Sequence, residues 1–142
     1  MAVPPGDFRH AKGLYFSLEP LQTDRDGWIT AIAVTLEGIV GGQNTHRQRT
    51  PMQYRLLASV KNLQPSLPVM WIASPRDQDI EHVNIFHPRQ VCPFVGVKLP
   101  DVCWGISDSA WREEKPEART LANLLAATHQ VLSNANFASR AR

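Results

Sequence analysis

The chain has 142 residues, of which 43% are hydrophobic and 20% are charged, and its formal net charge is +2. These values are typical of one folded domain and exclude a chain that is disordered as a whole. The small net charge argues against a nucleic-acid-binding protein, and no apolar run approaches the ~20 residues of a membrane-spanning helix. The first ten residues contain two prolines and no apolar stretch of the kind found in secretory signals, so we expect a cytoplasmic protein.

The chain contains two cysteines, Cys92 and Cys103. Two cysteines are too few for a disulfide framework, and in the cytoplasm both thiols should stay reduced. Each cysteine is therefore either a small buried apolar residue or a reactive group.

The first half of the chain predicts strands. Residues 1–27 have no clear periodicity, and we expect an N-terminal arm there, either extended or a short irregular helix. Residues 28–74 contain three segments with an approximate period of two, at 28–36, 53–60 and 69–73. Three successive strands with connecting turns predict an antiparallel β-meander.

The second half predicts a long loop followed by one helix. Residues 75–115 contain four prolines and two glycines and no long periodic stretch, which favours an ordered loop that carries function. Residues 116–137 start with a proline, which is tolerated in a first helical turn, and residues 138–142 form a basic tail. An apolar stripe spaced as on one helical face comprises Leu121, Leu124, Leu125, Thr128, Val131 and Leu132. The sequence thus predicts a single α+β domain.

Several short sequence phrases follow one another along the chain. They are the proline-rich turn at 63–68 with the strand after it, His82-Val83-Asn84-Ile85, Val102-Cys103-Trp104-Gly105, Trp111, and Thr120-Leu121-Ala122-Asn123-Leu124-Leu125 running to Asn136-Phe137. In this order the phrases resemble a ubiquitin-conjugating (E2) domain of the compact bacterial type. The resemblance covers residues 28–137 and implies a UBC-like fold, with a β-meander, an active-site loop and a C-terminal amphipathic helix.

The resemblance implies a carrier enzyme. Its thiol, Cys103, would accept a ubiquitin-like protein as a thioester from an E1-like activating enzyme and pass it to an amine on a target protein. Asn84 is the candidate donor to the oxyanion, because a side-chain amide can stabilise that charge. Asp101 and Asp108 flank Cys103 and could orient the amine, or could simply cap turns. No phosphate-binding glycine loop is present, so ATP chemistry should belong to the partner enzyme, and we expect no cofactor.

Two departures from the family pattern leave the nucleophile open. Val83 replaces the proline of the family's His-Pro-Asn phrase. Cys92 lies ten residues after His82, which is the usual family spacing, whereas Cys103 has the better local phrase and lies eight residues before Trp111. We favour Cys103, with Cys92 as the alternative, because the helix should begin soon after the nucleophile.

Two other functions stay open at this point. A non-catalytic E2-like module that binds or scaffolds its partners would explain the irregular phrase at His82. A structural zinc site would use four ligand types found within 22 residues, although no C-x₂-C pair is present; they are His82, His87, Cys92 and Cys103. The tryptophans near Cys103, Trp104 and Trp111, are interpreted as packing residues or as a surface for the extended tail of the carried protein.

Overall fold

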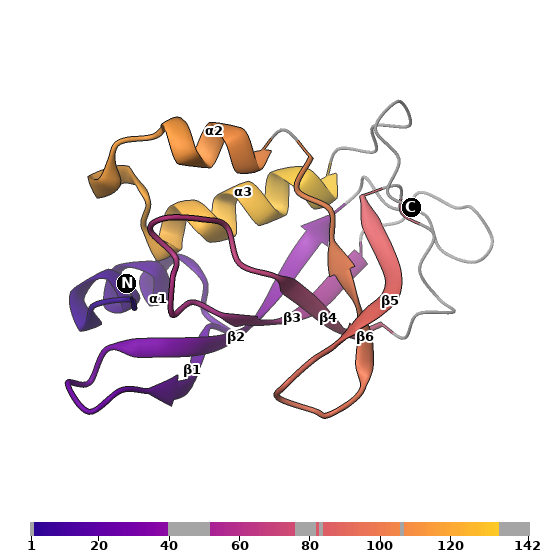
Figure 1. The fold of residues 1–142 in the computed structure, drawn as a ribbon, viewed down its shortest axis with the longest axis horizontal. Helices are drawn as coiled ribbons and strands as arrows, with labels where there is room; N and C mark the ends of the chain where they lie inside the picture. The colour runs from indigo at the N-terminus through magenta and orange to yellow at the C-terminus, as the bar shows by residue number, and fades with distance from the viewer. Residues whose placement is uncertain (1, 40–51, 76–81, 83, 106, 134–142) are drawn as a thin grey trace.

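The computed structural model describes residues 2–39, 52–75, 82, 84–105 and 107–133 (Figure 1). Its sheet has six strands in the spatial order β1-β2-β3-β4-β6-β5, and every pair is antiparallel. Together with the helices, this sheet confirms the predicted α+β class. The strands are β1 (Glu19–Thr23), β2 (Ile29–Ile39), β3 (Met52–Ser59), β4 (Met70–Ser74), β5 (Ile85–Val91) and β6 (Lys98–Val102), and the helices are α1 (Pro5–Leu14), α2 (Ser107–Glu113), the 3-10 helix η2 (Pro116–Ala118) and α3 (Leu121–Ser133).

The three strands predicted within residues 28–74 are confirmed as β2, β3 and β4. They pair in chain order, with Val34 opposite Leu56 and Leu56 opposite Ile72. All three of these side chains are buried in the same cluster, as the period of two requires. The meander is therefore a direct consequence of the alternating apolar pattern.

Residues 1–27 contain two regular elements, which corrects the predicted arm. The helix α1 begins at Pro5, whose fixed backbone angle suits the first turn, and it buries only Ala11. The strand β1 is an edge strand that pairs with β2, and all five of its side chains are exposed. The short helix is one of the two predicted alternatives, whereas the pairing of β1 with the sheet was not predicted, because a strand that buries so little carries no periodic apolar pattern.

Residues 75–115 are also more regular than expected, since β5, β6 and α2 lie within the predicted loop. The two strands form a hairpin that joins the sheet through β6 and β4. Pro88 lies in a bulge of the edge strand β5, and Pro93 lies in the hairpin turn, the two settings that tolerate proline. Gly96, with a φ of 75°, completes this turn by donating its N–H to the Cys92 carbonyl at 2.8 Å. Prolines that interrupt the alternation thus concealed a hairpin.

The predicted C-terminal helix is confirmed as α3, although it starts later than residue 116. Pro116 begins η2 instead, and residues 134–142, which include the predicted basic tail, lie outside the described residues. The hydroxyl of buried Thr128 donates to the carbonyl of Leu124 at 2.8 Å, so the apolar stripe accommodates this polar side chain. No described helix is long and apolar enough to cross a membrane.

The sheet has two different faces. The three α-helices lie on one side of it (Figure 1), which we call the inner face, and contribute to a large core cluster there. The opposite, outer face carries a smaller cluster to which no α-helix contributes a buried residue; its buried members are Ala33, Leu57, Trp71, Cys92 and Leu99. Because side chains alternate along β6, Asp101 belongs to the same outer face as Leu99 and lies opposite Trp71 of β4.

Candidate functional site

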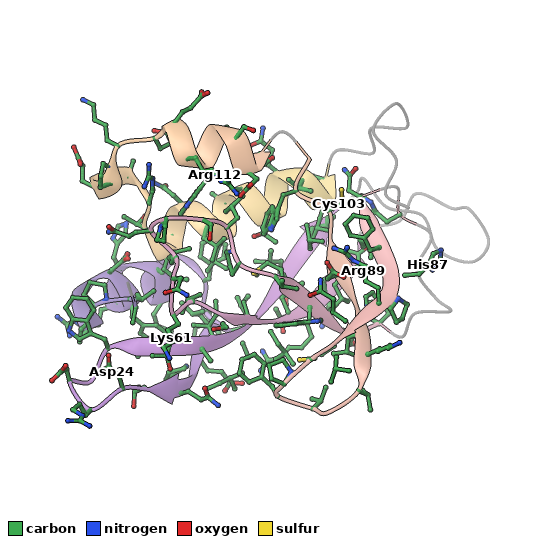
Figure 2. All side chains as sticks on the ribbon, in the orientation of Figure 1. Asp24, Lys61, His87, Arg89, Cys103 and Arg112 are labelled. Carbon is green, nitrogen blue, oxygen red and sulfur yellow. The ribbon has the colours of Figure 1, made fainter. Side chains whose placement is uncertain are left out.

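Cys103 lies where the chain leaves β6. Its backbone N–H donates to the carbonyl of Asn84 at 2.8 Å, which extends the β5–β6 pairing one step beyond Ile85 and Val102. The Cys103 side chain is partly exposed, and Figure 2 shows it at the end of the hairpin that adjoins α3. The structure therefore pairs the backbone of the predicted nucleophile with that of the predicted oxyanion donor.

His82 and Asn84 bind the C-terminal end of α3. The Nδ1 atom of His82 accepts the backbone N–H of Asn84 at 3.0 Å, so the ring proton lies on Nε2, which donates to the Leu132 carbonyl at 2.6 Å. The side-chain amide of Asn84 donates from Nδ2 to the Val131 carbonyl at 2.9 Å. The last carbonyls of a helix have no N–H donor within the helix, and the side chains of His82 and Asn84 donate to two of them here. The segment before β5 is thereby fixed to α3.

The His82 imidazole should make folding stability depend on pH. Burial lowers the pKa of His82 from its usual 6.5, against the opposing effect of the hydrogen bond to Leu132. Because the pKa of His82 is lower in the folded state, the unfolded chain takes up a proton at this imidazole more readily than the folded protein does. The contribution of neutral His82 to folding stability is therefore complete above about pH 6.5 and is lost as the pH falls below that value. We expect His82→Gln to remove this slope, measured as the urea-unfolding free energy at several pH values. An unchanged slope would contradict the assignment.

An arginine of β5 is held in place by Asp101, two residues before Cys103. The register of β5 against β6 shifts between Phe86 and Gln90, and this bulge directs Arg89 towards Asp101. The guanidinium donates from Nε to Oδ1 of Asp101 at 3.1 Å and from Nη2 to Oδ2 at 2.9 Å, and it stacks over the Phe86 ring at 3.7 Å from the centroid. The Asp101 contact, with a further contribution from nearby Cys103, raises the pKa of Arg89. Asp101, which holds Arg89, lies on β6 two residues before Cys103, and Figure 2 labels Arg89 and Cys103 on the hairpin of β5 and β6.

The pair of Arg89 and Asp101 should contribute measurably to stability. The Asp101 side chain is 2% exposed and that of Arg89 is 49% exposed, so Arg89→Met strands a buried carboxylate. We expect this change to destabilise the protein by ~3 kcal/mol. Adding Asp101→Asn removes the buried charge, so the double variant should lose less free energy of unfolding than the two single variants lose in total. The measurement is urea unfolding of all four proteins of the cycle.

Arg55 provides the matched control for this cycle. It forms an ion pair with Glu19 on the sheet, but both side chains are substantially exposed, at 32% and 53%. Such pairs contribute at most ~1 kcal/mol, so Arg55→Met should have a much smaller effect than Arg89→Met. Equal losses, or additive effects of the Arg89 and Asp101 changes, would show that the pair is not a coupled buried interaction.

Cys92 lies in a different environment from Cys103. It is fully buried on the outer face, in the cluster with Trp71 and Leu99. Its backbone N–H and carbonyl both bond within the hairpin turn, to Val97 and Gly96. This cysteine has the surroundings of a small apolar core residue.

Both aspartates predicted to meet an amine are paired with arginines. Both carboxylate oxygens of Asp101 accept bonds from Arg89, as described above. Asp108 lies on α2 and pairs with Arg112 at 2.7 Å, one helical turn away, with its side chain 33% exposed. Of the two carboxylates, Asp108 is the one that an incoming amine could reach without breaking a buried pair.

The tryptophans near Cys103 fix the turn that precedes β4. Trp104 donates its indole N–H to the carbonyl of Pro68 at 2.8 Å, and Trp111 donates to that of Leu63 at 3.0 Å. Trp111 is buried in the inner cluster, and Trp104 packs against it. These contacts favour the interpretation of both residues as packing residues.

The four residues of the zinc alternative are not brought together. Both ring nitrogens of His82 are engaged, Cys92 is enclosed on the outer face, and His87 is exposed and points away from Cys103 (Figure 2). Within the ranges that the structure describes, no group of three or more His, Cys, Asp and Glu side chains is arranged to hold a metal ion.

Arg89 is the residue of this site that the sequence did not reveal. In sequence Arg89 is only a basic residue that follows Pro88. Its position depends on the bulge in β5 and on the carboxylate of Asp101, which comes twelve residues later. A basic residue after a proline gives no signal of that contact.

Comparisons with protein-family models, with curated proteins and with solved structures find no match for this chain.

Proposed function

We propose that this chain is an E2-like carrier with a UBC-like fold, acting in the cytoplasm. Cys103 accepts a ubiquitin-like protein as a thioester from an E1-like activating enzyme and passes it to an amine on a target protein. The observation that supports this most is the position of Cys103, a partly exposed thiol hydrogen-bonded through its backbone to Asn84. The family resemblance of the surrounding phrases supplies the reaction class.

Two acyl transfers make up the proposed reaction. In the first, the Cys103 thiolate attacks the thioester carbonyl on the activating enzyme, and the enzyme's thiolate leaves with the electron pair of the broken C–S bond. In the second, the target amine attacks the Cys103 thioester, loses a proton, and expels the Cys103 thiolate. Each transfer passes through an oxyanion, which a preorganised N–H donor can stabilise.

Asn84 is the proposed donor in the second transfer. Its side-chain amide is anchored because one N–H donates to the Val131 carbonyl, and this bond fixes the plane of the amide at the end of α3. In the proposed reaction this side-chain amide donates to the thioester oxygen as negative charge develops there. Asp108, the more accessible aspartate, is the proposed contact for the incoming amine.

The test is incubation of the chain with an activating enzyme, ATP and a ubiquitin-like protein, taken from the genes that neighbour its own. We expect a covalent adduct that survives denaturing electrophoresis without reductant, disappears with dithiothreitol, and does not form when ATP is omitted. Binding without any adduct would refute the carrier function.

One observation favours a second candidate, a non-catalytic E2-like module that binds or scaffolds a ubiquitin-like protein. The His82 and Asn84 side chains both satisfy carbonyls of α3, a structural task that a binding module would need equally. That module would bind the ubiquitin-like protein with the same affinity whether or not Cys103 is replaced.

A further inference from the structure

The guanidinium of Arg89 has one edge used and one edge open. Its Nε and Nη2 atoms face Asp101, while Nη1 has no hydrogen-bond partner among the described residues, and the side chain is half exposed. Bidentate pairing and stacking on Phe86 fix the plane of this group without consuming its Nη1 hydrogens. An oriented donor of this kind is suited to recognising an oxygen acceptor.

The partner of Arg89, Asp101, lies on β6 two residues before Cys103. Phe86 pairs with Asp101 across the hairpin, and Cys103 follows Asp101 by two residues, so β5 and β6 present all of these groups at one end of the hairpin. An acyl group attached to Cys103 would therefore have its preceding residues near Arg89.

The nature of the acceptor follows from the charge balance. Asp101 already neutralises Arg89, so a second full anion gains little from the pair, whereas a neutral carbonyl still gains a hydrogen bond from a charged donor. An extended peptide carries a carbonyl at every residue. A peptide acyl chain thus fits the site better than a carboxylate or a phosphate does.

We propose that Arg89 is a specificity-determining residue that binds a main-chain carbonyl of the peptide acyl chain delivered to Cys103. This proposal rests on the proposed function in one respect, namely that Cys103 accepts an acyl group. The proposal adds the feature of the substrate that Arg89 recognises, which is a peptide carbonyl upstream of the thioester.

Small thioesters test this proposal without a partner enzyme. The probes are the ethyl thioesters of acetyl-Gly-Gly and of acetate, which differ in their upstream peptide carbonyls. In each reaction the Cys103 thiolate forms a new C–S bond and ethanethiolate leaves with the electrons of the old one. The rate of acylation of intact protein, followed by mass spectrometry, is divided by the rate for N-acetylcysteine to remove the intrinsic reactivity of each probe.

We expect the wild-type protein to favour the acetyl-Gly-Gly probe by about tenfold in this normalised rate, which corresponds to one hydrogen bond to a charged group. Arg89→Met should abolish the preference, so that the normalised rates for the two probes become equal, whatever change in thiolate reactivity the two rates share. A merely structural role for Arg89 would alter both rates together. Arg55→Met should keep the preference. Arg55 is also paired with a carboxylate, but it lies on β3, and β4 separates β3 from β6 in the sheet.

Three results would overturn the proposal: no preference in the wild type, a preference retained in Arg89→Met, or no acylation of Cys103 by either probe. If Arg89→Met does not fold, the variant that combines it with Asp101→Asn removes the stranded carboxylate and serves in its place. The outcome is separable from the proposed function. A peptide preference without an ATP-dependent adduct would support Arg89 recognition and reject the E2-like activity.

Discussion

Cys103→Ala is expected to abolish the reductant-sensitive adduct completely, whereas Cys92→Ala is expected to keep it. The thiol of Cys103 is partly exposed at the end of the hairpin, but that of Cys92 is enclosed by the outer cluster. A bulky thioester on an activating enzyme cannot reach a fully buried sulfur without local unfolding. The measurement is electrophoresis of each variant with and without reductant after incubation with activating enzyme, ATP and ubiquitin-like protein.

Cys92→Ala serves as the matched control in that experiment. It removes one sulfur atom from a packed apolar cluster and should cost only about 1 kcal/mol of stability, so the variant should remain folded. Adduct formation by Cys103→Ala together with its loss in Cys92→Ala would reverse the assignment. It would also imply that the hairpin turn opens during charging.

Asn84→Ala should slow transfer from the charged protein to free lysine by about 10²–10³, the usual effect of removing one oxyanion donor. Charging should be much less affected, because a thiolate is both a good nucleophile and a good leaving group, whereas amine attack depends more on stabilising the intermediate. Single-turnover kinetics separate the two steps. The charged protein is isolated, lysine is added, and the loss of thioester is followed with time.

The structural contribution of Asn84 must be separated from its proposed role in chemistry. Asn84→Ala also removes the bond to Val131, which should lower stability by about 1 kcal/mol. His82→Gln perturbs the same end of α3 through the Leu132 contact and therefore controls for this loss. Slow transfer in both variants would indicate that Asn84 only supports the helix end, and normal transfer in Asn84→Ala would exclude it as the oxyanion donor.

The meander and α3 were predictable because each buries one side of a regular element. The alternation in β2 and β3 and the spacing of Leu121, Leu124 and Leu125 in α3 report that burial directly. β1 was missed, and α1 was predicted only as one of two alternatives, for the converse reason: both elements bury almost nothing. The hairpin was missed because Pro88 and Pro93 occupy a bulge and a turn, positions that a sequence pattern cannot distinguish from loop.

The sequence by itself determined the α+β class, the meander and the C-terminal helix. It did not decide between Cys92 and Cys103 as the candidate nucleophile, because burial of a small side chain in a proline-rich segment depends on strands that come from elsewhere in the chain. Tertiary structure enclosed Cys92 against Trp71, joined the backbones of Cys103 and Asn84, and directed Arg89 towards Asp101. These contacts follow from the pairing of β4, β5 and β6 and from a bulge, and pairing between distant segments leaves no periodic signal in the sequence.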